Sequence, residues 1–139
     1  MHLETHRPLD QVFHFYADQH VQNHHRWDPD VTLTALSNQP PGGGSVIKRH
    51  ITRLGRVVDG EMTITEFDRD RAFAVEIHDG PATLFGRTTF TDLAGDRTSI
   101  DVKVDEPAIE DPELGRAIEQ LMQRSVDNIA GMLTGDQSD

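Results

Sequence analysis

The stretch Asp111–Gly135, DPELGRAIEQLMQRSVDNIAGMLTG, predicts a long C-terminal helix around which the rest of the chain can fold. Asp111 suits the N-cap, Pro112 the first helical position and Gly135 the far end. Apolar residues recur at helical spacing and form a stripe on one face: Leu114, Ile118, Leu121, Met122, Ile129, Met132 and Leu133. At about 1.5 Å per residue the helix spans roughly 33 Å, which is enough to cross a whole sheet.

Between Val31 and Asp105 the apolar residues instead alternate with polar ones, which is the period of a β-strand. The run Ile100, Val102, Val104 is one example. Turn-forming residues separate the alternating runs: Pro40–Ser45, Gly55, Asp59–Gly60, Asp68–Asp70, Asp79–Pro81 and Ala94–Asp96. One apolar face, one polar face and short connections predict an antiparallel sheet of about six strands.

Helical signals also appear before the sheet. Pro8 and Asp10 suit the first turn of a helix in RPLDQVFHFYADQ, Arg7–Gln19, and Asn23–Trp27 can form a second, short helix. A one-sided sheet and a one-sided helix bury their apolar faces against each other. The sequence therefore predicts an α+β fold: a curved antiparallel sheet wrapped around the C-terminal helix, with two short N-terminal helices closing one end. Such curvature leaves a space of the kind that holds ligands.

Composition narrows the possible functions. The 139 residues fit one domain, expected over residues 1–135, with a frayed polar tail at 136–139. The absence of cysteine excludes disulfides and thiolate metal sites, and a net charge of −11 disfavours nucleic acid as a partner. No apolar run approaches the roughly 18 residues of a membrane span, and the N-terminus has no apolar signal segment. We expect a soluble cytoplasmic protein without membrane insertion, either a monomer or a homodimer.

Several segments resemble the START-like, or SRPBCC, superfamily, and most of all its polyketide cyclase/dehydrase branch. The similar segments cover almost the whole chain: RPLDQVFHFYAD (Arg7–Asp18), RWDPDV (Arg26–Val31), GGGSVIKRHITRLGR (Gly42–Arg56), EMTITEFDRDRAFAVEI (Glu61–Ile77), GRTTFTDLAGDRTSIDVKVD (Gly86–Asp105) and the terminal helix. The resemblance implies a helix-grip fold with a cavity but no shared catalytic motif. The first strand, His2–His6, is short for the family, so the expected departure is at the sheet edge.

The resemblance implies binding of a small, largely apolar ligand that is polyketide-like, aromatic, or a lipid or isoprenoid, without a cofactor. The expected ligand-binding residues are Trp27, Ile64, Phe73, Val75, Leu84, Phe90, Val102, Met122, Ser125 and Ile129. Trp27 either plugs one end of the core or stands at the cavity entrance. Ser125 either offers its hydroxyl to the cavity or bonds back to the preceding turn.

The strand VIKRHITRL, Val46–Leu54, carries charge whichever face is buried. One register turns Lys48 and His50 inward, and the other turns Arg49 and Arg53 inward. A buried charge implies a partner, unless this is an edge strand with two wet faces. If His50 faces the cavity, it is the candidate general acid or base of the alternative function, a cyclase or dehydratase that orients a flexible substrate.

The stretch NHHRWDPDV, Asn23–Val31, is a candidate metal or catalytic cluster because two histidines and two aspartates lie close to Trp27 in the sequence. His20 and His24 have the i, i+4 spacing of zinc ligands on a helix, but no acidic residue completes a motif. We therefore expect an exposed polar helix end and no metal. The two aspartates flanking Pro29 are expected to turn the chain. A third possibility is an interaction module with a vestigial cavity.

Overall fold

A computed structural model describes residues 1–53, 55–80, 82–105 and 112–135, without the side chains of residues 112, 114, 115, 118, 134 and 135. Its elements follow in chain order: β1 (His2–Thr5), α1 (Leu9–Phe13), the π-helical turn η1 (His14–Asp18), α2 (His20–Trp27), β2 (Val31–Ala35), β3 (Val46–Arg53), β4 (Arg56–Asp68), β5 (Ala72–Asp79), β6 (Ala82–Ala94), β7 (Arg97–Asp105) and α3 (Pro112–Gly135). The expected tail and the N-cap Asp111 lie outside the described residues.

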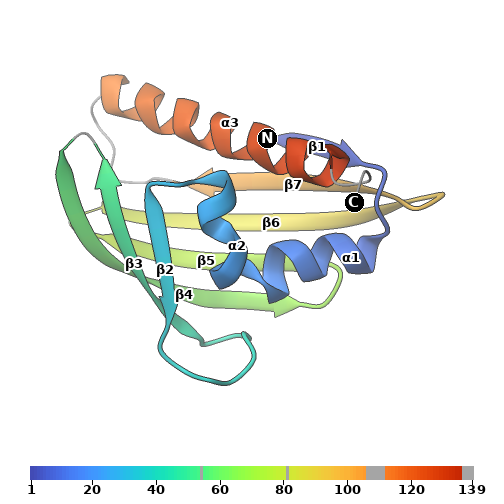
Figure 1. The fold of residues 1–139 in the computed structure, drawn as a ribbon, viewed down its shortest axis with the longest axis horizontal. Coiled ribbons are helices and arrows are strands. Elements are labelled where there is room, and N and C mark those ends of the chain that lie inside the picture. Colours follow the sequence, from blue (N-terminus) through green and yellow to red (C-terminus); the bar gives the residue numbers. More distant parts are fainter. Residues whose placement is uncertain (54, 81, 106–111, 136–139) are drawn as a thin grey trace.

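The strands form one antiparallel sheet in the order β1-β7-β6-β5-β4-β3-β2. The sheet has seven strands because the short segment His2–Thr5 pairs fully with β7, from His2 opposite Asp101 to Thr5 opposite Thr98. The first strand is therefore short, as expected, but it still completes this edge of the sheet. Figure 1 shows α3 and the short helices α1 and α2 on the same side of the curved sheet. This arrangement confirms the predicted α+β helix-grip fold.

The N-terminal helical region differs from the prediction in one respect. Its first helix passes into η1, and Gln19 leaves helical geometry, with φ −104° and ψ 26°. The second helix therefore starts afresh at His20, three positions before the expected Asn23. This shift decides which residues of α2 face the interior.

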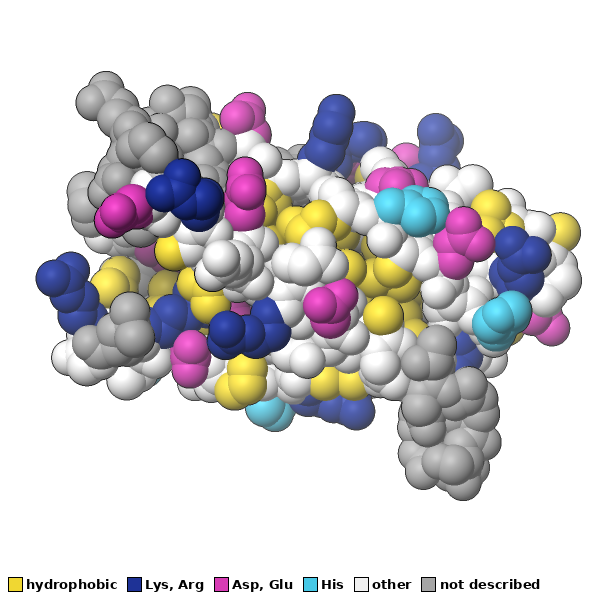
Figure 2. Space-filling view, turned by 90° about the horizontal axis from the view of Figure 1, so that it is seen from above, with side chains coloured by type: hydrophobic (Ala, Val, Ile, Leu, Met, Phe, Trp, Pro, Cys, Tyr) yellow, Lys and Arg dark blue, Asp and Glu magenta, His cyan; other side chains and the backbone are white. Residues whose placement is uncertain are grey.

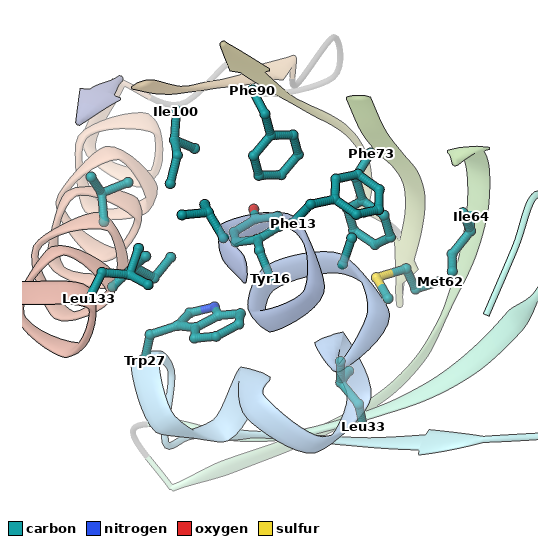
Figure 3. Packing of buried hydrophobic residues seen from close by; sticks show 14 of the residues in the cluster. Phe13, Tyr16, Trp27, Leu33, Met62, Ile64, Phe73, Phe90, Ile100 and Leu133 are labelled. Carbon is teal, nitrogen blue, oxygen red and sulfur yellow. The ribbon is translucent and has the colours of Figure 1, made fainter. Parts of the chain in front are cut away.

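Aromatic rings form the centre of the core. Phe13 packs edge-on against Phe67 and Phe90, with ring centroids 5.4 and 5.2 Å apart. Figure 3 shows Tyr16 and Trp27 continuing this cluster toward Leu133 of α3. Burial of these large apolar surfaces is the main driving force for folding.

The surface carries charges of both signs. On the face seen in Figure 2, acidic, basic and histidine side chains are interspersed among apolar patches. Among the described helices, none is both long enough and apolar enough to cross a membrane.

Candidate ligand-binding cavity

A cavity of about 320 Å³ lies between the concave face of the sheet and α3. Its wall is mainly apolar and is built by β3 to β7, the middle of α3, and the helices η1 and α2. Eight of the ten side chains expected in the pocket line it: Trp27, Phe73, Val75, Leu84, Val102, Met122, Ser125 and Ile129. Alternate residues of each strand point to the same face of the sheet. Residues at helical spacing on α3 point back toward that face.

Ile64 and Phe90 do not line the cavity. Both point to the interior side of the sheet, as expected, but both are buried in the core cluster. Phe90 lies under the N-terminal helices, where Phe13 covers its ring. The alternation fixed the face of these residues correctly, but it carries no information on which part of that face a helix covers.

Trp27 closes the core and forms part of the cavity wall. It is 3% exposed, and its ring stacks on Tyr16 with centroids 5.6 Å apart and an interplanar angle of 1°. Its carbonyl oxygen accepts a hydrogen bond from Asn128 Nδ2 at 3.0 Å, which ties α2 to α3. Of the two roles considered for Trp27, its burial favours the plug at one end of the core over the cavity entrance, and the plug also forms part of the wall.

The register of β3 places arginines inside. Ile47 and Ile51 are buried, and Arg49 between them is only 8% exposed. Arg49 binds Asp79 with Nε 3.0 Å from Oδ1 and Nη2 3.1 Å from Oδ2. This fork-to-fork geometry neutralises a charge that would otherwise be costly to bury. At the end of the strand, Arg53 pairs with Asp28 and Asp30.

The Arg49–Asp79 pair spans three strands. In the cross-strand register Arg49 lies opposite Gly60 of β4, which lies opposite Asp79 of β5. A Cβ atom at Gly60 would overlap the Asp79 carboxylate and the His78 carbonyl oxygen. Glycine at this position therefore lets two side chains from non-adjacent strands meet across the middle one.

His50 faces away from the cavity, which corrects the orientation required by the catalytic role considered for it. Its side chain is 53% exposed on the outer face of the sheet, and Nδ1 lies 2.7 Å from Asp59 Oδ1. Strand alternation is the physical reason, because turning Arg49 inward turns both of its neighbours outward. His50 instead borders a polar hollow on the outer face with Thr32, Lys48 and Glu61.

His20 and His24 are not exposed, contrary to the expectation. Because α2 begins at His20, the positions i, i+4 and i+7 put His20, His24 and Trp27 on one face, and all three line the cavity. His20 Nδ1 lies 2.9 Å from the Tyr16 carbonyl oxygen. Burial lowers the pKa of His20 to about 4 and holds the pKa of His24 well below its ordinary value.

Sequence reasoning missed both histidines and the Arg49–Asp79 pair as members of the cavity wall. The spacing of His20 and His24 to Trp27 was the available signal, since a residue expected in the wall fixes the face of its helix. Within the described residues, no three His, Cys, Asp or Glu side chains converge as metal ligands would. A second polar pair, Tyr16 Oη and Thr88 Oγ1, lies 2.9 Å apart in the wall, and burial raises the pKa of Tyr16.

Residues 3–133 match the family model for polyketide cyclase / dehydrase and lipid transport proteins. The chain belongs to this family, which lies within the SRPBCC superfamily that its sequence resembles. No curated protein sequence matches the chain.

Solved structures with the same fold share little sequence with the chain. Ara h 8.0201 is 16% identical with a TM-score of 0.77, and the alignment covers 96% of this chain and 94% of that one. The Zhui aromatase/cyclase from Streptomyces sp. R1128 is 17% identical with a TM-score of 0.73, over 96% and 90% of the two chains. The di-domain aromatase/cyclase StfQ of the steffimycin pathway is 16% identical with a TM-score of 0.73, over 96% and 44%. At these identities the likeness concerns the fold.

Proposed function

We propose that the protein binds one small, largely apolar molecule in the cavity between the sheet and α3. The cavity is the observation that supports the proposal. It has a volume of about 320 Å³, and aromatic and aliphatic side chains form most of its wall. Ligand sites of this type combine such walls with a few fixed polar groups. Membership of a family described by polyketide cyclisation and lipid transport supports ligands of the polyketide, aromatic or isoprenoid classes.

Binding is tested by isothermal titration calorimetry with an apolar bicyclic probe, 2-methoxynaphthalene, and by native mass spectrometry of the purified protein. One probe molecule per chain is the expected result. A protein that binds no probe and carries no co-purified adduct would contradict the proposal.

A cavity-filling variant locates the binding. Gly86 lines the cavity opposite Val75 and Val104, and a Cβ atom there would meet Val75 only at ordinary contact distance. Gly86→Phe therefore fills the space and is expected to abolish binding. The matched control is Thr91→Phe, which places the same ring on the exposed face of the same strand. Unchanged binding of the probe to Gly86→Phe would show that the binding site lies outside this cavity.

A cyclase or dehydratase reaction is the second candidate, and the Arg49–Asp79 pair in the cavity wall favours it. Asp79 takes the Nε and Nη2 donors of Arg49, and Nη1 remains to donate a hydrogen bond to the negative charge that develops on an enolate oxygen. His50 has no part in this version. Incubation with a short poly-β-ketone thioester tests it by mass spectrometry, where loss of water faster than in buffer is expected and Arg49→Met abolishes it. Equal rates with and without protein would exclude the reaction.

We further propose that the protein acts in the cytoplasm as a monomer or homodimer without a nucleic-acid partner. The net charge of −11 supports the last point, since it opposes approach to phosphate backbones.

A further inference from the structure

The polar groups of the cavity wall differ in how far the protein itself satisfies them. Arg49 and Asp79 bond to each other, and so do Tyr16 and Thr88. Two histidines differ from these pairs within the described part of the chain: only one ring nitrogen of His20 has a partner, and the buried Nδ1 of His24 has none. Polar groups in an apolar wall are otherwise paired, so an unpaired one is a position where a ligand atom can bond.

The bond that His20 makes fixes its tautomer. The Tyr16 carbonyl oxygen, 2.9 Å from Nδ1, can only accept, so Nδ1 carries the proton. Because burial keeps His20 neutral at pH 7, Nε2 on the opposite side of the ring holds a lone pair. The cavity wall therefore contains an imidazole that accepts a hydrogen bond and cannot donate one at this atom.

Packing holds the His20 ring in place. The rings of Phe73, His24 and Tyr16 surround it with centroids 4.8, 5.1 and 5.5 Å away, and the side chain is 6% exposed. A ring held on several sides loses little freedom on binding, which favours recognition by a single hydrogen bond.

We propose that His20 Nε2 accepts a hydrogen bond from a hydroxyl group of the ligand, so that the cavity selects aromatic alcohols and phenols over ligands that carry only acceptor oxygens. The assignment rests on the proposed ligand-binding function and specifies its ligand class. A ketone, ether or carboxylate would place a lone pair against that of Nε2, leaving both unsatisfied in an apolar site. The aromatic neighbours Tyr16, Trp27 and Phe73 favour a flat ring system beside the hydroxyl.

A matched pair of probes isolates the hydrogen bond. 2-Naphthol and 2-methoxynaphthalene share the same ring system, but only the first has a hydroxyl donor. One neutral hydrogen bond predicts a preference of roughly fivefold to tenfold for 2-naphthol by calorimetry. His20→Phe keeps an aromatic ring at this position but removes the acceptor, so the preference is expected to vanish while 2-methoxynaphthalene still binds.

His25→Phe is the control, since His25 is the exposed neighbour of His24 on the same helix and does not line the cavity. It should retain the preference for 2-naphthol. Equal affinity of both probes for the wild type, or a preference that survives His20→Phe, overturns the role of His20 while the cavity remains a binding site. Failure of both probes to bind the wild type overturns the ligand-binding function and this assignment together.

A measurement on the wild type keeps the proposal testable if His20→Phe does not fold. Long-range ¹H–¹⁵N spectra report the tautomer and bonding of each histidine ring. His20 is expected as the Nδ1–H tautomer, and 2-naphthol should shift its Nε2 resonance while 2-methoxynaphthalene does not. A His20 ring protonated at Nε2, or an Nε2 resonance that does not shift when 2-naphthol is added, would refute the assignment.

Discussion

The buried ion pair of the cavity occupies space that Gly60 leaves open. Arg49 and Asp79 come from strands that are not neighbours, and their carboxylate–guanidinium bonds pass over the strand between them. Only a residue without a side chain leaves that space open. The Arg49–Asp79 ion pair therefore requires a glycine that makes no side-chain contact with either partner.

Gly60→Ala is expected to lower the free energy of unfolding by about 1–3 kcal/mol, the range for overpacking, because its methyl group overlaps Asp79 and the His78 carbonyl. Urea denaturation followed by circular dichroism measures this change. Gly42→Ala is the control, since nothing lies within 4 Å of a Cβ atom there. Equal stability of both variants would show that the strands move apart without cost.

His20 makes stability depend on pH. Its pKa is about 4 in the folded protein, because burial disfavours the charged ring, and near 6.5 in the unfolded chain. The unfolded chain thus takes up a proton first, so this contribution is fully present above about pH 6.5 and is lost as the pH falls toward 4. The shift corresponds to roughly 3 kcal/mol between those limits.

The comparison of wild type with His20→Gln isolates this effect from the carboxylates, which titrate in both proteins. Urea unfolding at pH 7 and at pH 4.5 should show a smaller loss of stability in the variant. A parallel decline in the two proteins would mean that His20 is not held neutral.

Strand β3 shows what sequence could and could not determine at this scale. Alternation left two registers, with Lys48 and His50 or Arg49 and Arg53 inside, and it correctly required a partner for a buried charge. The partner Asp79 lies 30 residues away, so only the sheet register identifies it. The choice of His50 as a catalytic group rested on chemistry alone, and its place on the outer face removes the basis for that choice.

Among the elements, α3 combines an apolar face toward the sheet with an exposed outer face. Gly131 lies on the outer side, and a Cβ atom there has nothing within 4 Å. Packing of α3 against the sheet therefore does not require a glycine at this position. Gly131 remains a local weakness of the helix.

Gly131→Ala is expected to raise the free energy of unfolding by about 1 kcal/mol, the difference in helix propensity between the two residues. Thermal and urea unfolding measure it. The reverse change at an exposed alanine of the same helix, Ala117→Gly, should lower stability by a similar amount. No gain in Gly131→Ala would indicate that this part of α3 contributes little to the cooperative unit.

Element boundaries also decided how well the site could be predicted. Strand periodicity and the stripe of α3 placed most of the apolar wall correctly, since both patterns depend only on the residues of one element. The histidines were misplaced because α2 was expected to begin at Asn23, whereas η1 ends at Asp18 and α2 begins at His20. A helix that began at Asn23 would leave His20 outside it, and only the earlier start puts His20 on the same face as His24 and Trp27.

At the scale of the whole molecule, a sheet curved around one helix leaves its core incompletely filled. Lining atoms of a cavity lack contacts on one side, so a ligand that fits restores them. The same architecture therefore favours a ligand-dependent stability.

A ligand at one hundred times its dissociation constant should raise the free energy of unfolding by about 2.7 kcal/mol, provided that it binds only the folded chain. Differential scanning fluorimetry with 2-naphthol measures the accompanying rise in Tm. Gly86→Phe, which fills the cavity, should show no such rise. A rise of equal size in that variant would place the probe at the surface.

The stack of Tyr16 on Trp27 has an optical consequence. The chain has one tryptophan and one tyrosine, and both form the wall of the cavity. Indole emission, energy transfer from the phenol ring and much of the near-ultraviolet dichroism therefore originate at a single locus. The protein thus carries an intrinsic chromophore pair in the wall of the cavity, so changes inside the cavity can be followed without a label.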